Sequence, residues 1–135
     1  EKARRKMASG KQSKQAAATP PSRQEVKALV EAGNGAAALE MANRLLAKNK
    51  KDVELLLLKG RALILLKKYG EAKRVLTKAM VTDPNRAEPF YWLGEANRLE
   101  GDAERARYYF RLYLRSRSPD VETDKIKQAQ AFVGG

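Results

Sequence analysis

A set of small and apolar residues in this 135-residue chain recurs with a spacing of 34 positions. The first set consists of Gly60, Ala72, Leu76, Ala79 and Pro84. The second set, in which the proline comes one position late, consists of Gly94, Ala106, Phe110, Tyr113 and Pro119. A fixed period of this length is typical of stacked helix–turn–helix units, which mostly present a binding surface to other molecules. The period therefore predicts an all-α repeat architecture.

Helix signals occur in pairs and predict about seven helices after residue 21. Ser22 and Glu25 have the spacing of a capping box at the start of the first helix. Asp52 is a suitable N-cap for a helix over residues 53–66, whose leucines lie on more than one face and predict burial on most sides. We expect the other helices over residues 36–48, 70–81, 86–99, 103–115 and 119–133.

Two of these helices have further predicted caps. Asn85, with Glu88 three residues later, has the spacing of a second capping box. Ser118-Pro119-Asp120 offers an N-cap, a proline at the first helical position and an acidic residue in the first turn of the last helix. We therefore expect both helices to begin with local side-chain caps.

The spacing within each helix pair resembles the tetratricopeptide repeat (TPR) family, which prefers aromatic, Gly, aromatic, Ala, aromatic, Ala and Pro at its signature positions. A repeat that begins at Val53 has Leu56, Gly60, Leu63, Ala72, Leu76, Ala79 and Pro84 in this pattern. A repeat that begins at Ala87 has Phe90, Leu93, Gly94, Asn97, Ala106, Phe110 and Tyr113. We expect Gly60 and Gly94 to lie opposite Ala72 and Ala106, so that two helices approach closely.

The resemblance implies a right-handed superhelical stack of antiparallel helix pairs over residues 22–135. It covers about 110 of the 135 residues. A degenerate repeat at about 19–52 is followed by repeats at 53–86 and 87–120 and by a solvating capping helix at about 119–133. The first repeat departs from the pattern at Val26, where Gly is expected, and at Ala42, where an aromatic residue is expected. These departures argue against a full-length leading helix.

Residues 1–21 differ in composition from the rest of the chain. They carry six Lys or Arg against one Glu and end in Pro20-Pro21. Such a segment buries too little apolar surface to offset its ordering entropy, so we predict a basic flexible tail or linker. Because the chain begins at Glu1 rather than Met, we also expect a piece of a longer or processed polypeptide.

The sequence contains no Cys and no His. It therefore lacks thiol nucleophiles, disulfides and imidazole bases, together with nearly all zinc and haem ligation. The carboxylates lie singly along the predicted helix faces, which disfavours an enzyme that works with paired carboxylates. We predict that the chain is not an enzyme and has no catalytic residues, no cofactor and no metal site.

TPR domains bind extended or helical peptides in a concave groove lined by the first helix of each repeat. The resemblance implies that the partner-binding groove here is lined by Leu57, Leu58, Arg61, Ile64, Tyr91, Trp92, Glu95 and Arg98. We interpret the leucines, Tyr91 and Trp92 as an apolar floor, rimmed by charges, for an amphipathic partner segment. The alternative is that Trp92 and the leucines only pack between neighbouring repeats.

The predicted function is that of a protein–protein interaction adaptor, which holds a peptide or an amphipathic helix of another protein. Self-association through an exposed groove is a further use of the same surface. The chaperone-binding carboxylate clamp of the family is not expected, because Leu58, Glu88 and Trp92 stand where it needs Asn, Lys and Arg.

The alternative from another class is a nucleic-acid- or acidic-surface-binding module, because the net charge is +12. It would use the basic tail and the outer helix face that carries Arg107, Tyr108, Tyr109, Arg111 and Arg115. We favour a solvated face over a nucleic-acid site, since Glu100 and Glu104 partly neutralise this stripe.

No stretch approaches the ~20 apolar residues that span a bilayer. Contact with a membrane would therefore come only through the tail or through a segment outside this sequence. We expect a cytoplasmic protein, with a periplasmic or membrane-tethered protein as the alternative.

Overall fold

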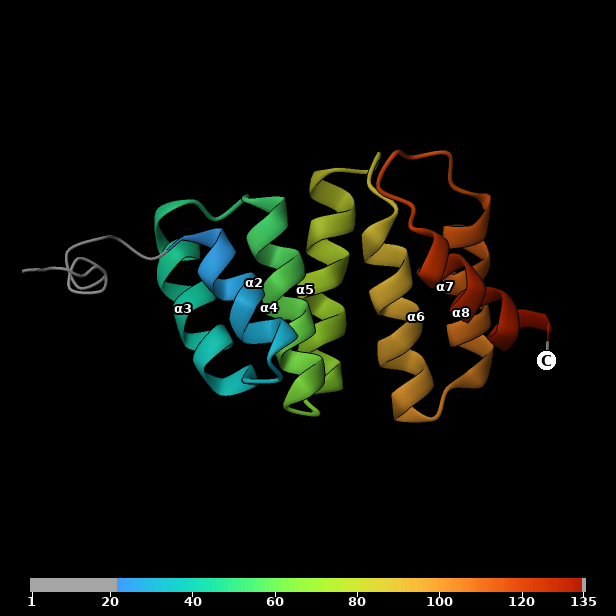
Figure 1. Ribbon diagram of the computed structural model, residues 1–135, viewed down its shortest axis with the longest axis horizontal. Helices are drawn as coiled ribbons and strands as arrows, with labels where there is room; N and C mark the ends of the chain where they lie inside the picture. The colour runs from blue at the N-terminus through green and yellow to red at the C-terminus, as the bar shows by residue number, and fades with distance from the viewer. Residues whose placement is uncertain (1–21, 135) are drawn as a thin grey trace, which may run out of the picture.

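The computed structural model describes residues 22–134, which form seven α-helices and no strand. The helices are α2 (Arg23–Glu31), α3 (Gly35–Lys48), α4 (Val53–Leu65), α5 (Tyr69–Thr82), α6 (Glu88–Glu100), α7 (Ala103–Arg115) and α8 (Thr123–Gly134). They stand side by side in a row, with α3 near one end and α7 and α8 at the other (Figure 1). The all-α prediction is confirmed. The basic tail predicted for residues 1–21 lies outside the described residues.

The helices form two rows. α2 packs against α4 and α4 packs against α6, whereas no comparable packing joins α3 to α5 or α5 to α7. The first helices of the pairs therefore form an inner row, and the second helices form a more widely spaced outer row. We call the side formed by α2, α4 and α6 the inner surface and the side formed by α3, α5 and α7 the outer surface. None of the helices within residues 22–134 has the length and hydropathy that a membrane crossing requires.

The predicted caps of the first two repeats are present. The Ser22 hydroxyl accepts a hydrogen bond from the Glu25 amide (3.4 Å), and the Glu25 carboxylate accepts one from the Ser22 amide (3.0 Å). Asp52 accepts a hydrogen bond from the Leu55 amide (3.1 Å) at the start of α4. With 9 residues, α2 is shorter than the 13 residues of α4 and α6, in line with the eroded first repeat.

The two caps predicted further along the chain are wrong. The amide of Asn85 donates to the Asp83 side chain (3.2 Å) in a turn, and α6 begins at Glu88 without a side-chain cap from its own flank. Instead, the Asp120 carboxylate accepts hydrogen bonds from the amides of Ala87 (2.9 and 3.1 Å) and Glu88 (3.0 Å). Asp120 therefore caps α6, and α8 begins only at Thr123.

The repeat period explains why this cap comes from a distant residue. Asp52, Arg86 and Asp120 are successive members of one series with a spacing of 34. Asp52 caps the helix that follows it, but Arg86 has only donors and cannot accept a hydrogen bond from a helix amide. The free amides at the start of α6 are left to Asp120, and the Arg86 side chain lies 3.5 Å from that carboxylate.

The 34-residue spacing of Gly60 and Gly94 corresponds to two points of close helix contact. A Cβ added at Gly60 would lie 2.5 Å from Leu76, and one added at Gly94 would lie 2.5 Å from Phe110. The expected close approach is thus present, but the residues that face the glycines are Leu76 and Phe110 rather than Ala72 and Ala106. Both glycines accommodate a large side chain from the second helix of their own pair.

The core changes from aliphatic to aromatic along the row. The first cluster spans α2 to α6 and consists mainly of Leu, Ile, Val and Ala. The second cluster lies among α6, α7 and α8 and contains Tyr91, Phe110 and Tyr113, with Phe132 packed against it. Trp92 packs against both clusters and so lies at their boundary.

Candidate functional site

The residues predicted to line the groove divide into two groups. The side chains of one group belong to the core, with exposed fractions of 1% for Leu57, 1% for Leu58, 8% for Ile64 and 3% for Tyr91. The side chains of the other group are accessible in part or in full: Arg61, Trp92, Glu95 and Arg98.

A floor made of Leu57, Leu58 and Tyr91 is therefore wrong. The leucines are covered because α4 is in the middle of the stack and packs against α2, α3, α5 and α6. Tyr91 is covered by α8, whose Gln128 side chain accepts a hydrogen bond from the Tyr91 hydroxyl. For these side chains the packing alternative is correct, and of the two aromatic residues predicted for the groove Trp92 keeps exposed surface.

Two cations lie close to the Trp92 ring on the inner surface. The Arg61 guanidinium of α4 is 4.7 Å from the Trp92 ring centroid, and the Lys125 ammonium of α8 is 5.6 Å from it. Cations at such distances are attracted by the ring quadrupole. The indole N–H donates to the Glu88 carboxylate (3.1 Å), which fixes the orientation of the ring. We call Arg61, Trp92 and Lys125 the cation–Trp cluster.

Arg61 retains binding capacity in this cluster. Its Nε is buried and has no hydrogen-bond partner among the described residues. The guanidinium also forms no ion pair with any residue in the range 22–134. Lys125, by contrast, pairs with Glu122 on its own helix. The cluster therefore carries an excess positive charge beside a partly exposed indole.

An ion-pair network adjoins the cluster at the start of α6. Arg86 lies 3.1 Å from Glu54, 3.3 Å from Glu88 and 3.5 Å from Asp120. Burial alone would lower the pKa of the Arg86 guanidinium, but the hydrogen bond and charge of Glu54 and the charges of Glu88 and Asp120 outweigh it and raise the pKa. Arg86 therefore stays charged and holds α4, α6 and the segment before α8 together.

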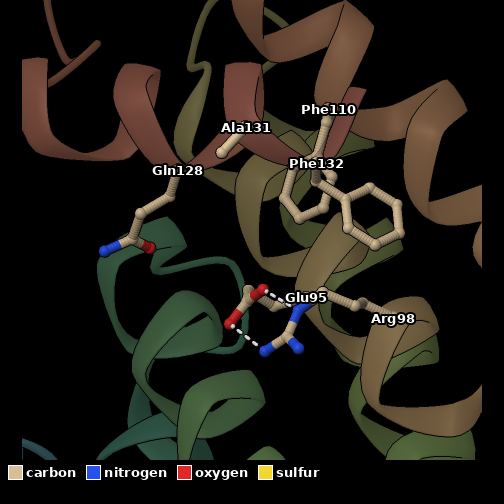
Figure 2. A pocket seen from close by; sticks show the side chains of 6 residues that line it. All are labelled: Glu95, Arg98, Phe110, Gln128, Ala131 and Phe132. Atoms are coloured by element: carbon tan, nitrogen blue, oxygen red, sulfur yellow. Dashed lines mark hydrogen bonds and ion pairs between the residues drawn. The ribbon is translucent and has the colours of Figure 1, made fainter. Parts of the chain in front are cut away.

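A pocket of about 420 Å³ opens among α6, α7 and α8, and its lining residue Glu95 follows Trp92 by three positions on α6. Figure 2 shows the rings of Phe110 and Phe132 at one end and the Glu95–Arg98 pair at the other. The two rings are 5.4 Å apart in an edge-to-face arrangement, and Arg98 binds Glu95 through two nitrogens at 2.7 and 3.2 Å. The hydrogen bond that Arg98 donates to the Glu95 carboxylate raises the pKa of Arg98 above its ordinary value. The pocket therefore offers an apolar end and a polar end.

Lys125 and Gln128 are site residues that the sequence analysis missed. The last helix was interpreted only as a solvating cap, but α8 takes the place of the first helix of a further repeat. The period itself contained the signal, because Lys125 and Gln128 lie 34 residues after Tyr91 and Gly94. Extending the repeat by one unit would have placed Lys125 at the position for which Tyr91 was predicted to line the groove.

The burial of Tyr91 by α8 can be tested through its ionisation. Burial, followed by the Glu95 charge, raises the pKa of Tyr91 to about 12. The unfolded phenol ionises near pH 10, so this burial stabilises the fold below pH 10 and the gain is lost as the pH rises through the folded value. We expect the phenolate absorbance difference between the wild type and Tyr91→Phe to titrate near pH 12. A midpoint near pH 10 would contradict the packing of α8 over this ring.

The arrangement suits binding rather than chemistry. Among residues 22–134 no group of three or more Asp, Glu, His or Cys side chains lies close enough to hold a metal ion. The features gathered on the inner surface are an aromatic ring, unpaired positive charge and an adjacent pocket with a hydrophobic end. Aromatic and arginine side chains of this kind are the usual anchors of protein interfaces.

Comparison with known proteins agrees with the repeat architecture. Models of the tetratricopeptide repeat family match residues 29–91 and 66–121. No curated protein is a significant match in sequence. The fold is similar to that of SycD, the type III secretion translocator chaperone of Yersinia enterocolitica, in its alternative dimer, with a TM-score of 0.74 and 13% identity over 83% of this chain and 86% of SycD.

Two similar structures contain peptides. SycD in complex with a peptide of the translocator YopD has a TM-score of 0.73 and 13% identity, over 83% of this chain and 86% of that chain. The second TPR domain of human RPAP3 in complex with an HSP70 peptide has a TM-score of 0.67 and 19% identity, over 82% of this chain and 90% of that chain. At these identities the similarity establishes the fold.

Proposed function

Since the chain belongs to the tetratricopeptide repeat family, whose members are typically non-catalytic protein-interaction domains, we propose that it binds a peptide segment of a partner protein on its inner surface. The observation that carries this proposal is the cation–Trp cluster, in which two cations lie close to a partly exposed indole. The bound peptides in the similar SycD and RPAP3 structures support the choice of a peptide as the partner.

The chemistry of the inner surface defines the kind of peptide. The pocket bounded by Phe110 and Phe132 would accept an aliphatic or aromatic side chain, which would remove apolar surface from water. The Arg61 guanidinium would pair with a carboxylate of the peptide, because it has no acidic partner among the described residues. The proposed ligand is thus a short segment that carries an apolar anchor and an acidic residue within reach of Arg61.

The proposal is tested by selecting peptides from a random displayed library on the immobilised chain. Selected peptides should combine an apolar anchor with acidic residues, and Trp92→Ala should weaken their binding at least about tenfold, as expected for a central anchor. Binding is measured by calorimetry, and circular dichroism checks that the variant is folded.

Tyr108→Ala is the matched control, because Tyr108 is an aromatic side chain with 57% exposure on the outer helix α7. This variant should bind the selected peptides as tightly as the wild type. Equal binding by the wild type and a folded Trp92→Ala variant would overturn the proposal. A selection that yields no peptide would count against it as well.

A further inference from the structure

The outer surface has a groove between α3 and α5 whose charge is not balanced. α4 packs against both helices and lies between them (Figure 1), while α3 and α5 have no comparable packing with each other. A groove of about 280 Å³ results, in which Val75 is partly exposed and the buried side chains of Leu46 and Leu56 lie at the bottom. Its remaining lining residues are all basic: Lys50, Lys59, Arg74 and Lys78. We call this the outer basic groove.

The positive charge of this groove is available to a ligand. No acidic residue lines it, and none of its four cations forms an ion pair with a residue in the described range. The neighbouring groove between α5 and α7 provides a contrast within the same fold. There Lys73 pairs with Glu100 (2.5 Å) and Arg105 with Asp102 (3.6 Å), so two of its three cations are neutralised internally. The third, Arg74, lines both grooves.

From this charge and shape we infer that the outer basic groove binds an acidic segment of a protein partner that also carries leucine-like side chains. The four cations would pair with carboxylates along the two edges, and the apolar side chains of the segment would contact the partly exposed Val75 between them. The inner surface proposed above does not take part, so one chain could hold two segments at once.

A protein segment fits this groove better than a nucleic acid does. Proteins that bind single-stranded nucleic acid combine positive charge with aromatic side chains on which bases stack. No aromatic residue lines the outer basic groove. The aliphatic lining instead matches the apolar face of an amphipathic peptide. Tyr108 and Tyr109 lie on α7, in a different groove.

The test uses a designed 12-residue peptide in which Leu recurs at helical spacing and the other positions are Glu. We expect saturable binding that weakens with added salt and that falls at least tenfold in the Lys59→Glu/Lys78→Glu variant. A peptide with Ser in place of Leu should also bind at least tenfold more weakly, because it cannot use the apolar lining. Trp92→Ala should leave binding of this peptide unchanged. The test of the outer basic groove is therefore independent of the test of the inner surface.

Arg107→Glu/Arg111→Glu is the matched control, because it makes the same change in net charge on α7 outside the groove. It should retain binding to within about twofold. The inference is overturned if the wild type does not bind the peptide, or if the two double variants lose binding equally. It is also overturned if a 12-residue oligouridylate or phosphatidylserine vesicles bind the groove more tightly than the peptide does.

Discussion

Phe110→Ala should lower the free energy of unfolding by about 3–5 kcal/mol, and adding Gly94→Ala to that variant should cost little more. The Phe110 ring is 2% exposed and packs against Tyr91 and Phe132. In the wild-type background Gly94→Ala alone should cost about 1–3 kcal/mol, because the new methyl group would lie 2.5 Å from that ring. In the double variant the methyl group enters the space that the ring has left.

Chemical denaturation of the four chains in this cycle measures the coupling. The double variant should be more stable than additivity predicts by about 1 kcal/mol or more, as expected for residues in direct contact. Gly70→Ala serves as the control for the change of Gly to Ala in a helix, because a Cβ there meets no atom within 4 Å. Strict additivity would show that Gly94 and Phe110 do not face each other, which would contradict the packing of α6 on α7.

Asp120→Asn should destabilise the chain by about 2 kcal/mol at neutral pH, a value that combines a lost N-cap with a lost ion pair. The carboxylate caps α6 from a position 32 residues after Glu88 and lies 3.5 Å from Arg86. Its removal would weaken the two amide hydrogen bonds and leave Arg86 with fewer acidic partners. Asp124→Asn, on the exposed first turn of α8, should change stability by less than about 0.5 kcal/mol.

The effect of Asp120 should depend on pH in a defined direction. Burial alone would raise the pKa of its carboxyl, but the hydrogen bonds from Ser118, Ala87 and Glu88 and the charge of Arg86 outweigh it and lower the pKa. The unfolded chain therefore takes up the proton first, at about pH 3.9. The contribution of Asp120 is complete above that pH and is lost as the pH falls through the lower folded value. Denaturation at several acidic pH values should show the wild type and Asp120→Asn converging. A constant difference would contradict this assignment.

The helix pairs were predictable because their signals are local. Ser22 with Glu25 and Asp52 cap the helices that follow them directly, and the period of 34 supplied the order of the pairs. The start of α6 was not predictable in the same way. Asn85 and Glu88 have suitable spacing, but the chain turns at Asp83, and a carboxylate that is distant in sequence satisfies the free amides. A local pattern does not reveal which of two capping groups will reach a helix end.

The candidate site was predictable only in part. Trp92 and Arg61 were assigned to the inner surface and have accessible side chains there. Tyr91 was predicted to line the floor of the groove, but it is more deeply buried than Phe90 and forms part of the aromatic cluster. The reason is α8, which covers Tyr91 and supplies Lys125. Because the last helix was interpreted as a solvating cap, the predicted site lacked α8, the helix that completes it.

Quenching of the single tryptophan provides the most direct test of the proposed peptide-binding function. Trp92 is the only Trp in the chain, so its fluorescence reports on the inner surface alone. With a saturating concentration of a selected peptide, quenching by acrylamide should decrease, because the bound segment covers the indole close to Arg61 and Lys125. The concentration dependence should follow the binding curve measured by calorimetry. Peptide binding that leaves both the emission and the quenching of Trp92 unchanged would contradict the assignment of the inner surface as the binding site.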